Sequence, residues 1–256
     1  MEKYFVFSDV HSFYDEFISE LKKKGFDENN PEHFLISCGD LFDRGHGSKP
    51  LLDFIYRMYR ADRIILVKGN HDTLFEEMIS RGYALSHDVS NGTVRTLMDL
   101  YVKQTPDEPN PVRTAANPEF YTRYDKRISE LFKASKWYVE SDKFIFVHGW
   151  IPLHCEDWRN ATEDAWEAAS WENGMQAWED GIRVKGKTIV CGHWHCSWGW
   201  WHIKGEREEF PDKRIDGWQN SFEPFIADGI MAIDGCTAYS GKVNIIVLNE
   251  EDMYNN

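Results

Sequence analysis

The segment Gly39-Asp40-Leu41-Phe42-Asp43-Arg44-Gly45 follows the apolar run Phe34-Leu35-Ile36-Ser37 almost at once and carries two carboxylates and an arginine between two glycines. A short, continuously apolar run is typical of a strand that is buried on both faces. In α/β folds, the loops beyond the carboxyl ends of such strands collect the reactive side chains. We therefore expect a functional loop at this position.

Four further apolar runs end in loops of the same kind. These loops are Ser8-Asp9-Val10-His11, Gly69-Asn70-His71-Asp72, His148-Gly149 and Gly192-His193-Trp194-His195. Taken singly, Asp, Asn and His are ordinary turn and cap residues after a strand. Taken together, the five loops form a ligand set for two metal ions, because hard oxygen donors and imidazole suit manganese, iron or zinc.

The runs that carry these loops predict the strands of a layered core, at residues 4–7, 34–37, 64–67, 144–147 and 188–190. Segments with helical spacing lie between them, at 13–24, 49–59, 73–81, 93–102, 119–136 and 162–169. Two further runs, 230–233 and 243–248, predict a closing pair of strands. The alternation of strand, loop and helix predicts an α/β fold.

The length of 256 residues, without a Pro-rich or Ser-rich linker, predicts one domain spanning residues 1–256. Two regions escape the alternation, at about 82–126 and 196–225, and we expect both to be insertions that cover the site. The first should be partly helical with an irregular middle, because it contains Pro106, Pro109, Pro111 and Pro118.

The net charge and the cysteine content limit which partners and which cellular compartment we expect. A formal net charge of -14 opposes attraction to a polyanion, so we do not expect duplex nucleic acid as a substrate. No apolar stretch approaches the length of a membrane span, and the N-terminus lacks the features of a secretory signal. Five cysteines without a Cys-x-x-Cys pair fit a reducing compartment, so we expect a cytoplasmic protein. Cys38 and Cys191 should be small buried hydrophobes, and the oligomeric state stays open.

An aromatic-rich segment begins at the last loop. Its aromatic residues are Trp194, Trp198, Trp200, Trp201, Phe210, Trp218, Phe222 and Phe225. Such a density of rings is common in core packing under a long loop. The alternative is an apolar wall that stacks a base or an aromatic side chain of a substrate.

The order of the motifs resembles the calcineurin-like metallophosphoesterase superfamily: Asp-x-His, Gly-Asp-x-x-Asp-Arg-Gly, Gly-Asn-His-Asp, His-Gly and Gly-His-x-His. The Asp-Arg-Gly element is similar to the protein serine/threonine phosphatase branch. Residues 232–236 with Gly241-Lys242 are similar to bacterial members of that branch, which include diadenosine tetraphosphate hydrolases. The resemblance implies a layered α/β/β/α sandwich with a dinuclear metal site on loops at the carboxyl ends of strands.

The resemblance also implies a ligand set in which Asp40 bridges the two ions. The ligands of the first metal are then Asp9, His11, Asp40 and, from the second histidine of Gly-His-x-His, His195. The ligands of the second metal are Asp40, Asn70, His148 and His193. We expect Mn²⁺, with iron, zinc, nickel or cobalt as alternatives.

The resemblance assigns His71 as the general acid, oriented by Asp43, and places Asn70, His71 and Arg44 in the substrate site. A leaving alkoxide needs a proton, and an imidazole paired with a carboxylate is held protonated near neutral pH. Arg44 has a planar fork that binds two phosphoryl oxygens at once. A second phosphate-binding arginine has no clear counterpart near Trp171, and Arg159 or Arg183 is its candidate substitute.

We therefore expect a metal-dependent hydrolase of phosphomonoesters, similar to protein serine/threonine phosphatases, in which a metal-bridging hydroxide attacks phosphorus without a phosphoenzyme. The substrate would be a phosphorylated small molecule, a nucleotide or a phosphoprotein. The closest alternative is a hydrolase of diadenosine polyphosphates, followed by a phosphodiesterase.

Overall fold

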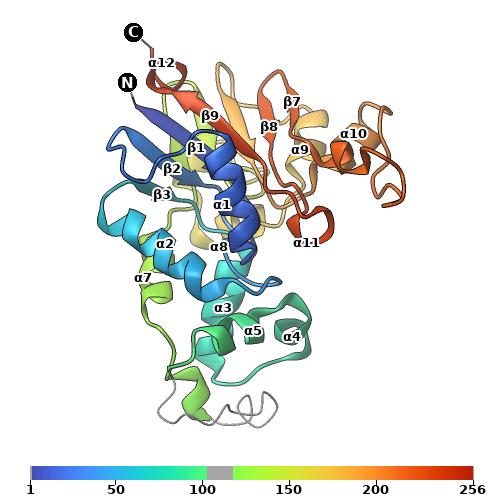
Figure 1. The fold of residues 1–256 in the computed structure, drawn as a ribbon. Helices are drawn as coiled ribbons and strands as arrows, with labels where there is room; N and C mark the ends of the chain where they lie inside the picture. Colours follow the sequence, from blue (N-terminus) through green and yellow to red (C-terminus); the bar gives the residue numbers. More distant parts are fainter. Residues whose placement is uncertain (1, 103–117, 256) are drawn as a thin grey trace.

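The computed structural model describes residues 2–102 and 118–255, and two β-sheets pack against each other in its centre (Figure 1). The first sheet has the order β3-β2-β1-β9, and the second has the order β4-β5-β6-β8-β7. The strands of the first sheet are β1 (Lys3–Phe7), β2 (His33–Ser37), β3 (Ile64–Leu66) and β9 (Ile245–Asn249). The strands of the second sheet are β4 (Val139–Glu140), β5 (Phe144–Phe146), β6 (Thr188–Cys191), β7 (Phe225–Ala227) and β8 (Ile230–Ala232).

The strands that carry the motif loops run parallel within each sheet. In the first sheet β1, β2 and β3 are parallel and β9 is antiparallel to β1. In the second sheet β5, β6 and β8 are parallel, and β4 and β7 are antiparallel edges. Because parallel neighbours end on the same side of a sheet, their loops gather at one edge.

Helices cover the outer face of each sheet. Because successive side chains of a strand point to opposite faces, Val6 belongs to the buried cluster between the sheets that also contains Phe146, whereas Phe5 belongs to the cluster on the outer face. The outer face of the first sheet packs against α1 (Tyr14–Lys23) and α2 (Ser48–Arg60). The outer face of the second packs against α8 (Glu163–Ala169), α9 (Gly174–Glu179) and α10 (Cys196–His202). This layering confirms the expected α/β/β/α sandwich.

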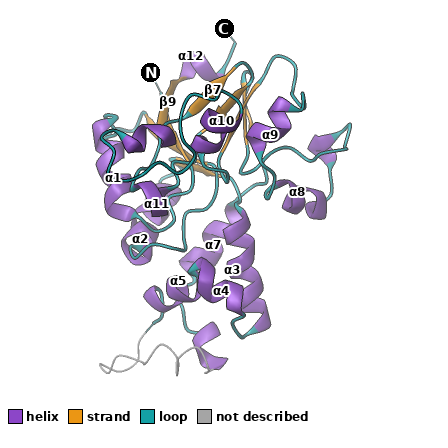
Figure 2. Ribbon diagram, turned by 90° about the vertical axis from the view of Figure 1, so that its right-hand side faces the viewer, coloured by secondary structure: helices purple, strands orange, loops and turns teal. Residues whose placement is uncertain are grey.

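A group of helices lies below the sheets in Figures 1 and 2 and extends the first core. Its members are α3 (Asn70–Arg81), α4 (Ser86–Asn91), α5 (Thr93–Asp99), the 3-10 turn η1 (Pro118–Tyr121) and α7 (Arg127–Ala134). The remaining short elements are η2 (Trp158–Asn160), η3 (Trp218–Phe222), α11 (Thr237–Ser240) and α12 (Glu250–Met253). In the described ranges no helix is long and apolar enough to cross a membrane.

Several sequence-based boundaries differ from the structure. The helix expected at 119–136 is interrupted: η1 and α7 are separated by a segment in which Tyr124 bridges to Tyr101. The predicted pairing of 230–233 with 243–248 is wrong, because β8 lies between β6 and β7 whereas β9 adds to β1 in the other sheet. Each strand completes a different sheet, and α11 lies between them in the chain. The irregular middle expected around Pro106, Pro109 and Pro111 lies outside the described residues.

Cys38 and Cys191 are buried, as expected, and all five cysteines are free. In the aromatic-rich segment, Trp194, Trp198 and Trp200 pack against the core of the second sheet. Trp201 and Phe210 are exposed, at 48% and 54%. Core packing therefore accounts for part of the segment and leaves two rings open to solvent.

Candidate metal centre

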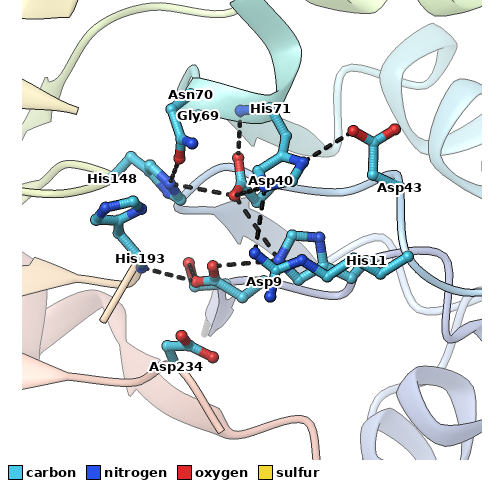
Figure 3. A network of polar contacts seen from close by, with 12 residues as sticks. Asp9, His11, Asp40, Asp43, Gly69, Asn70, His71, His148, His193 and Asp234 are labelled. Atoms are coloured by element: carbon cyan, nitrogen blue, oxygen red, sulfur yellow. Dashed lines mark hydrogen bonds and ion pairs between the residues drawn. The ribbon is translucent and has the colours of Figure 1, made fainter. Parts of the chain in front are cut away.

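Asp40 is the point at which the motif loops meet (Figure 3). Its Oδ2 atom lies 3.8 Å from His11 Nε2, 3.9 Å from His71 Nε2 and 3.4 Å from His148 Nε2. Two groups of side chains place potential ligand atoms close enough to hold an ion, His11-Asp40-His71 and Asp40-His148-His193. Asp40 belongs to both groups, which is the position that a bridging carboxylate requires.

Asp9 and Asn70 supply oxygen atoms beside these two groups. The Asp9 Oδ2 atom accepts hydrogen bonds from the Ser8 hydroxyl and from the His193 backbone N–H, and its Oδ1 atom lies 3.7 Å from His11 Nε2. The Asn70 Oδ1 atom lies 2.8 Å from His148 Nε2. Asp9 is therefore on the His11 side of Asp40, and Asn70 is on the His148 side.

Two of the histidines are oriented by a hydrogen bond from Nδ1, the ring nitrogen that faces away from Asp40, as is common for metal-binding histidines. His11 Nδ1 donates to the Phe42 carbonyl at 2.9 Å, and His148 Nδ1 donates to the Cys38 carbonyl at 2.8 Å. Such bonds fix the ring orientation and direct Nε2 toward a metal. The donor set of carboxylate, amide and imidazole, with Nε2 atoms turned toward one carboxylate, fits two divalent cations.

Because these groups are buried, the pKa of each depends strongly on the charges of its neighbours. Burial raises the pKa of Asp9, and the charge of Asp40 raises it further. Burial also acts to raise the pKa of Asp40, but His148 and His71 outweigh it and hold that pKa well below its usual value. Burial lowers the pKa of His148, but Asp40 outweighs it and raises the pKa to about 10. Buried carboxylates at this spacing need nearby positive charge, which protons on histidine or bound cations supply.

The backbone is shaped to bring these side chains together. Asp9, His11, Asp40, Asp43 and His193 all have positive φ, between 50° and 75°. Left-handed backbone is uncommon for residues other than glycine and is concentrated at functional sites. The chain turns at Asp9 and His11, in the loop after β1, and both side chains lie beside Asp40.

Gly69 allows α3 to begin against Asp40. A Cβ atom at Gly69 would lie 2.1 Å from Asp40 Oδ1 and 2.5 Å from the Asp40 nitrogen. In the same place the His71 backbone N–H donates to Asp40 Oδ1 at 3.1 Å. The start of α3 therefore fixes the orientation of the shared carboxylate.

His71 is paired with Asp43 at the edge of the centre. His71 Nδ1 lies 2.8 Å from Asp43 Oδ2, and its Nε2 atom lies 3.3 Å from an Arg44 guanidinium nitrogen. Burial lowers the pKa of His71, but Asp40 and Asp43 outweigh it and raise the pKa above its usual value. The pair is arranged to hold a proton on an imidazole that faces the centre.

Two threonines of α5 hold Asp43 from the other side. The Thr93 hydroxyl donates to Asp43 Oδ2 at 2.7 Å, and the Thr96 hydroxyl donates to Asp43 Oδ1 at 2.9 Å. Arg44 is fixed nearby, because its N–H donates to the Asn91 carbonyl at 3.2 Å. The described end of the 82–126 region thus contacts the site through Asp43 and Arg44.

His195 lies apart from both groups of potential ligands in the described residues. Its Nδ1 atom lies 2.8 Å from the Ser197 hydroxyl, and its Nε2 atom lies 3.5 Å from Glu209 Oε1. The two-residue spacing suggested that His193 and His195 face the same side, but the φ of 64° at His193 turns the chain between them. The ligand role expected for His195 stays a prediction.

Neither candidate for a second phosphate-binding arginine is directed to the centre by its contacts. Arg159 makes two bonds to Glu140, at 2.7 and 2.8 Å. Arg183 lies over the ring of Trp178, with 4.4 Å to the ring centroid. Arg44 is the arginine that the structure brings to His71.

The structure adds residues that the motifs did not single out. Asp234 is buried on the far side of Asp9 (Figure 3), and its Oδ1 atom accepts a bond from the Cys236 N–H at 2.7 Å. Trp171 lies beside His193, with ring centroids 5.8 Å apart. The sequence signal for Asp234 was its place in segment 232–236, but Thr93, Thr96 and Trp171 belong to no motif.

The two sheets gather a shared carboxylate, histidines and an Asp-His pair at their loop edge, an arrangement that fits a metal-binding phosphoesterase. The chain belongs to the calcineurin-like phosphoesterase family, whose pattern matches residues 3–225. This membership agrees with the resemblance that the motifs carry.

Curated relatives match parts of the chain. A symmetrical bis(5'-nucleosyl)-tetraphosphatase of Buchnera aphidicola is 39% identical over 72 residues, which are 28% of this chain and 24% of that protein. The asymmetrical bis(5'-nucleosyl)-tetraphosphatase PrpE of a Geobacillus strain is 26% identical over 152 residues, or 56% of this chain and 55% of that protein. These matches thus cover between about a quarter and about half of the relatives' lengths.

Solved structures show the same fold at low identity. A cold-active protein-tyrosine phosphatase of a psychrophilic Shewanella superposes with a TM-score of 0.55 and 18% identity, covering 98% of this chain and 76% of that one. A protein described as a candidate diadenosine tetraphosphatase superposes with a TM-score of 0.52 and 14% identity, covering 96% and 89%. These similarities establish the fold and do not extend to a substrate.

Proposed function

We propose that this protein hydrolyses phosphoric esters with two divalent metal ions and with His71 as the general acid. The observation that carries the proposal is the position of Asp40, whose carboxylate lies among His11, His71 and His148 with Oδ2 3.4 to 3.9 Å from their Nε2 atoms. The His71-Asp43 pair lies at the edge of the same cluster. Ligands and acid are thus close enough to act on one phosphoryl group.

The ligand assignment uses both groups around Asp40, except that His71 is kept as the general acid and Asp9 takes its place. Asp9, His11 and Asp40, with His195 as the further ligand expected from the motif, would hold one ion, and Asp40, Asn70, His148 and His193 would hold the other. Two such ions, which we propose to be Mn²⁺, would supply a strong nucleophile from water and would neutralise the attacking and leaving oxygens. Asp40 belongs to both groups, so its carboxylate would help to hold both ions.

His71 and Arg44 act on the phosphoryl group from the side of α5. His71 holds a proton at Nε2, while its Nδ1 atom is bonded to Asp43, and Nε2 would protonate the leaving oxygen. Arg44 is exposed, with a guanidinium nitrogen 3.3 Å from His71 Nε2, so its fork reaches the same substrate oxygens. Together they favour an ester whose departing oxygen is basic.

The leading substrate class is a phosphomonoester, because a terminal phosphoryl dianion uses the extra cation of Arg44 best. The second candidate is a dinucleoside polyphosphate. It is favoured by the names of the curated relatives, which are bis(5'-nucleosyl)-tetraphosphatases. A cytoplasmic location also stays part of this proposal.

The test compares a phosphoserine peptide, an aryl phosphate and diadenosine tetraphosphate side by side with Mn²⁺. Hydrolysis of the two monoesters supports the leading class, and hydrolysis of the dinucleotide alone replaces it with the second. The variant Asp40→Asn should lose activity toward every substrate that the natural protein hydrolyses. Unchanged turnover in that variant would refute the bridging role of Asp40.

A further inference from the structure

Trp171 is a half-exposed indole beside a residue of the metal centre. It is 49% exposed, and its ring meets the His193 ring edge to face, with centroids 5.8 Å apart and an interplanar angle of 83°. The backbone of Trp171 also makes a hydrogen bond to His193. The indole is therefore attached to the centre by two contacts while much of its surface faces solvent.

The position of Trp171 is fixed by the turn after α8. Gly149 lets that turn approach closely, because a Cβ atom there would lie 2.4 Å from the Ala169 carbonyl oxygen and 2.8 Å from that of Ser170. The Trp150 N–H donates to the Ala169 carbonyl at 3.0 Å. The turn is thus held against the residues that follow His148, and Trp171 is directed to the centre by packed backbone.

A second exposed ring lies at the other histidine of the same loop. Phe210 is 54% exposed, and its ring centroid lies 4.7 Å from that of His195. Large aromatic side chains usually lose most of their exposure on folding, and exposed ones held at a site are typical of ligand contacts. The loop Gly192-His193-Trp194-His195 is therefore bordered by aromatic surface next to the proposed phosphate-binding position.

We propose that Trp171 is a specificity-determining residue that stacks on the nucleobase of a nucleotide substrate whose phosphate lies between Asp40 and Arg44. This inference rests on the proposed phosphoesterase function and narrows its substrate class. Stacking on an aromatic side chain tolerates any base, because every base has a π-face. A nucleotide joins such a base to phosphate, so the indole and the metal centre would bind the two parts of one molecule.

The test uses Trp171→Ala and Trp171→Phe, with Trp201→Ala as the matched control. Trp201 is 48% exposed on α10, and its ring contact is His202, which lies outside the proposed centre. The KM and kcat values are measured with Mn²⁺ for diadenosine tetraphosphate and for glycerol phosphate, which has no ring. We expect Trp171→Ala to raise the KM for the dinucleotide roughly tenfold, within the range of about 5-fold to 150-fold that one base stack represents.

Trp171→Phe should retain most of the affinity for the dinucleotide, and Trp201→Ala should match the natural protein. The KM for glycerol phosphate should change less than twofold in all three variants. Equal losses on both substrates would overturn the proposal, because they would indicate a displaced His193. A normal KM for the dinucleotide in Trp171→Ala would overturn it too.

A binding measurement separates this inference from the proposed function. Calorimetry with a methylene-bridged diadenosine tetraphosphate analogue measures affinity without turnover. If the natural protein hydrolyses none of the substrates, the proposed function fails. A roughly tenfold weaker affinity of Trp171→Ala for the analogue would then still support stacking, and an equal affinity would refute it.

Discussion

Replacing Asp43 by Asn removes one of the two carboxylate charges, Asp40 and Asp43, that raise the pKa of His71, while preserving the size of the side chain. His71 Nδ1 lies 2.8 Å from Asp43 Oδ2, and Thr93 and Thr96 donate to the same carboxylate at 2.7 and 2.9 Å. General acid catalysis contributes roughly 10²-fold to 10⁴-fold to a reaction. We therefore expect Asp43→Asn to lower kcat about 10²-fold or more for an alkyl phosphate.

The leaving group reveals whether the loss comes from the acid. An alkoxide needs a proton as it departs, whereas p-nitrophenolate is a weak base and needs little help. The kcat for p-nitrophenyl phosphate should therefore fall less than tenfold in Asp43→Asn. The assay measures kcat for both esters at saturating Mn²⁺. An equal loss for both leaving groups would refute the acid role of His71, because it would point to damage at the metal ligands.

Thr93→Val is a milder version of the same perturbation. It removes one donor from Asp43 Oδ2, the oxygen that also accepts from His71. A hydrogen bond to a charged group contributes about 1.5–3 kcal/mol, and about 1.4 kcal/mol corresponds to a tenfold change in rate. The upper limit is therefore roughly a 10-fold to 150-fold loss for the alkyl phosphate, with the same dependence on the leaving group. Thr93→Ser keeps the hydroxyl and should restore most of the activity.

Three further changes test the metal centre and the fold. Asp40→Asn should abolish turnover and weaken Mn²⁺ binding, which calorimetry of metal binding measures directly. Gly69→Ala should displace Asp40, because the new Cβ would lie 2.1 Å from its Oδ1 atom, so metal affinity and kcat should both fall while circular dichroism keeps its helical signal. Arg159, followed by Lys187, lowers the pKa of Glu140 from 4.5 to about 2, so the stabilisation by this group is present above pH 4.5 and is lost as the pH falls toward 2. Glu140→Gln should therefore lower the free energy of unfolding at pH 7 by about 1 kcal/mol or less, which denaturant titration measures. The difference from the natural protein should shrink at acid pH.

The apolar runs and their loops predicted the fold because they depend on local chemistry. The strand runs at 4–7, 34–37 and 144–147 lie within or around β1, β2 and β5, and each is followed by its polar loop. A strand that is buried on both faces must be apolar throughout, so its signal is short and clear. Which strands pair with each other was harder to predict from the sequence, because pairing depends on contacts between distant segments. The pairing of β9 with β1 joins the two ends of the chain, and no local pattern specifies it.

The candidate site shows the same division between local and distant information. The loops indicated Asp9, His11, Asp40 and His148, and the structure brings these side chains together. The orientation of His195 could not be predicted, because it depends on the φ of 64° at His193. The bonds from Thr93 and Thr96 to Asp43 span 50 and 53 residues of sequence, and a threonine in a helix carries no sign of such a partner.

The proposed metal ligands and the proposed substrate-facing groups come from different parts of the fold. Asp9, Asp40 and His148 follow strands of the two central sheets, whose packing fixes them. Arg44 follows β2 as well, but it is positioned by the region around α4 and α5: a Cβ atom at Gly92 would lie 2.4 Å from the Arg44 nitrogen. Trp171 is presented by the turn after α8. Changes in these outer segments would alter the acid, the arginine and the aromatic contact while leaving the ligands in place, which is how one metal-binding fold supports different substrates.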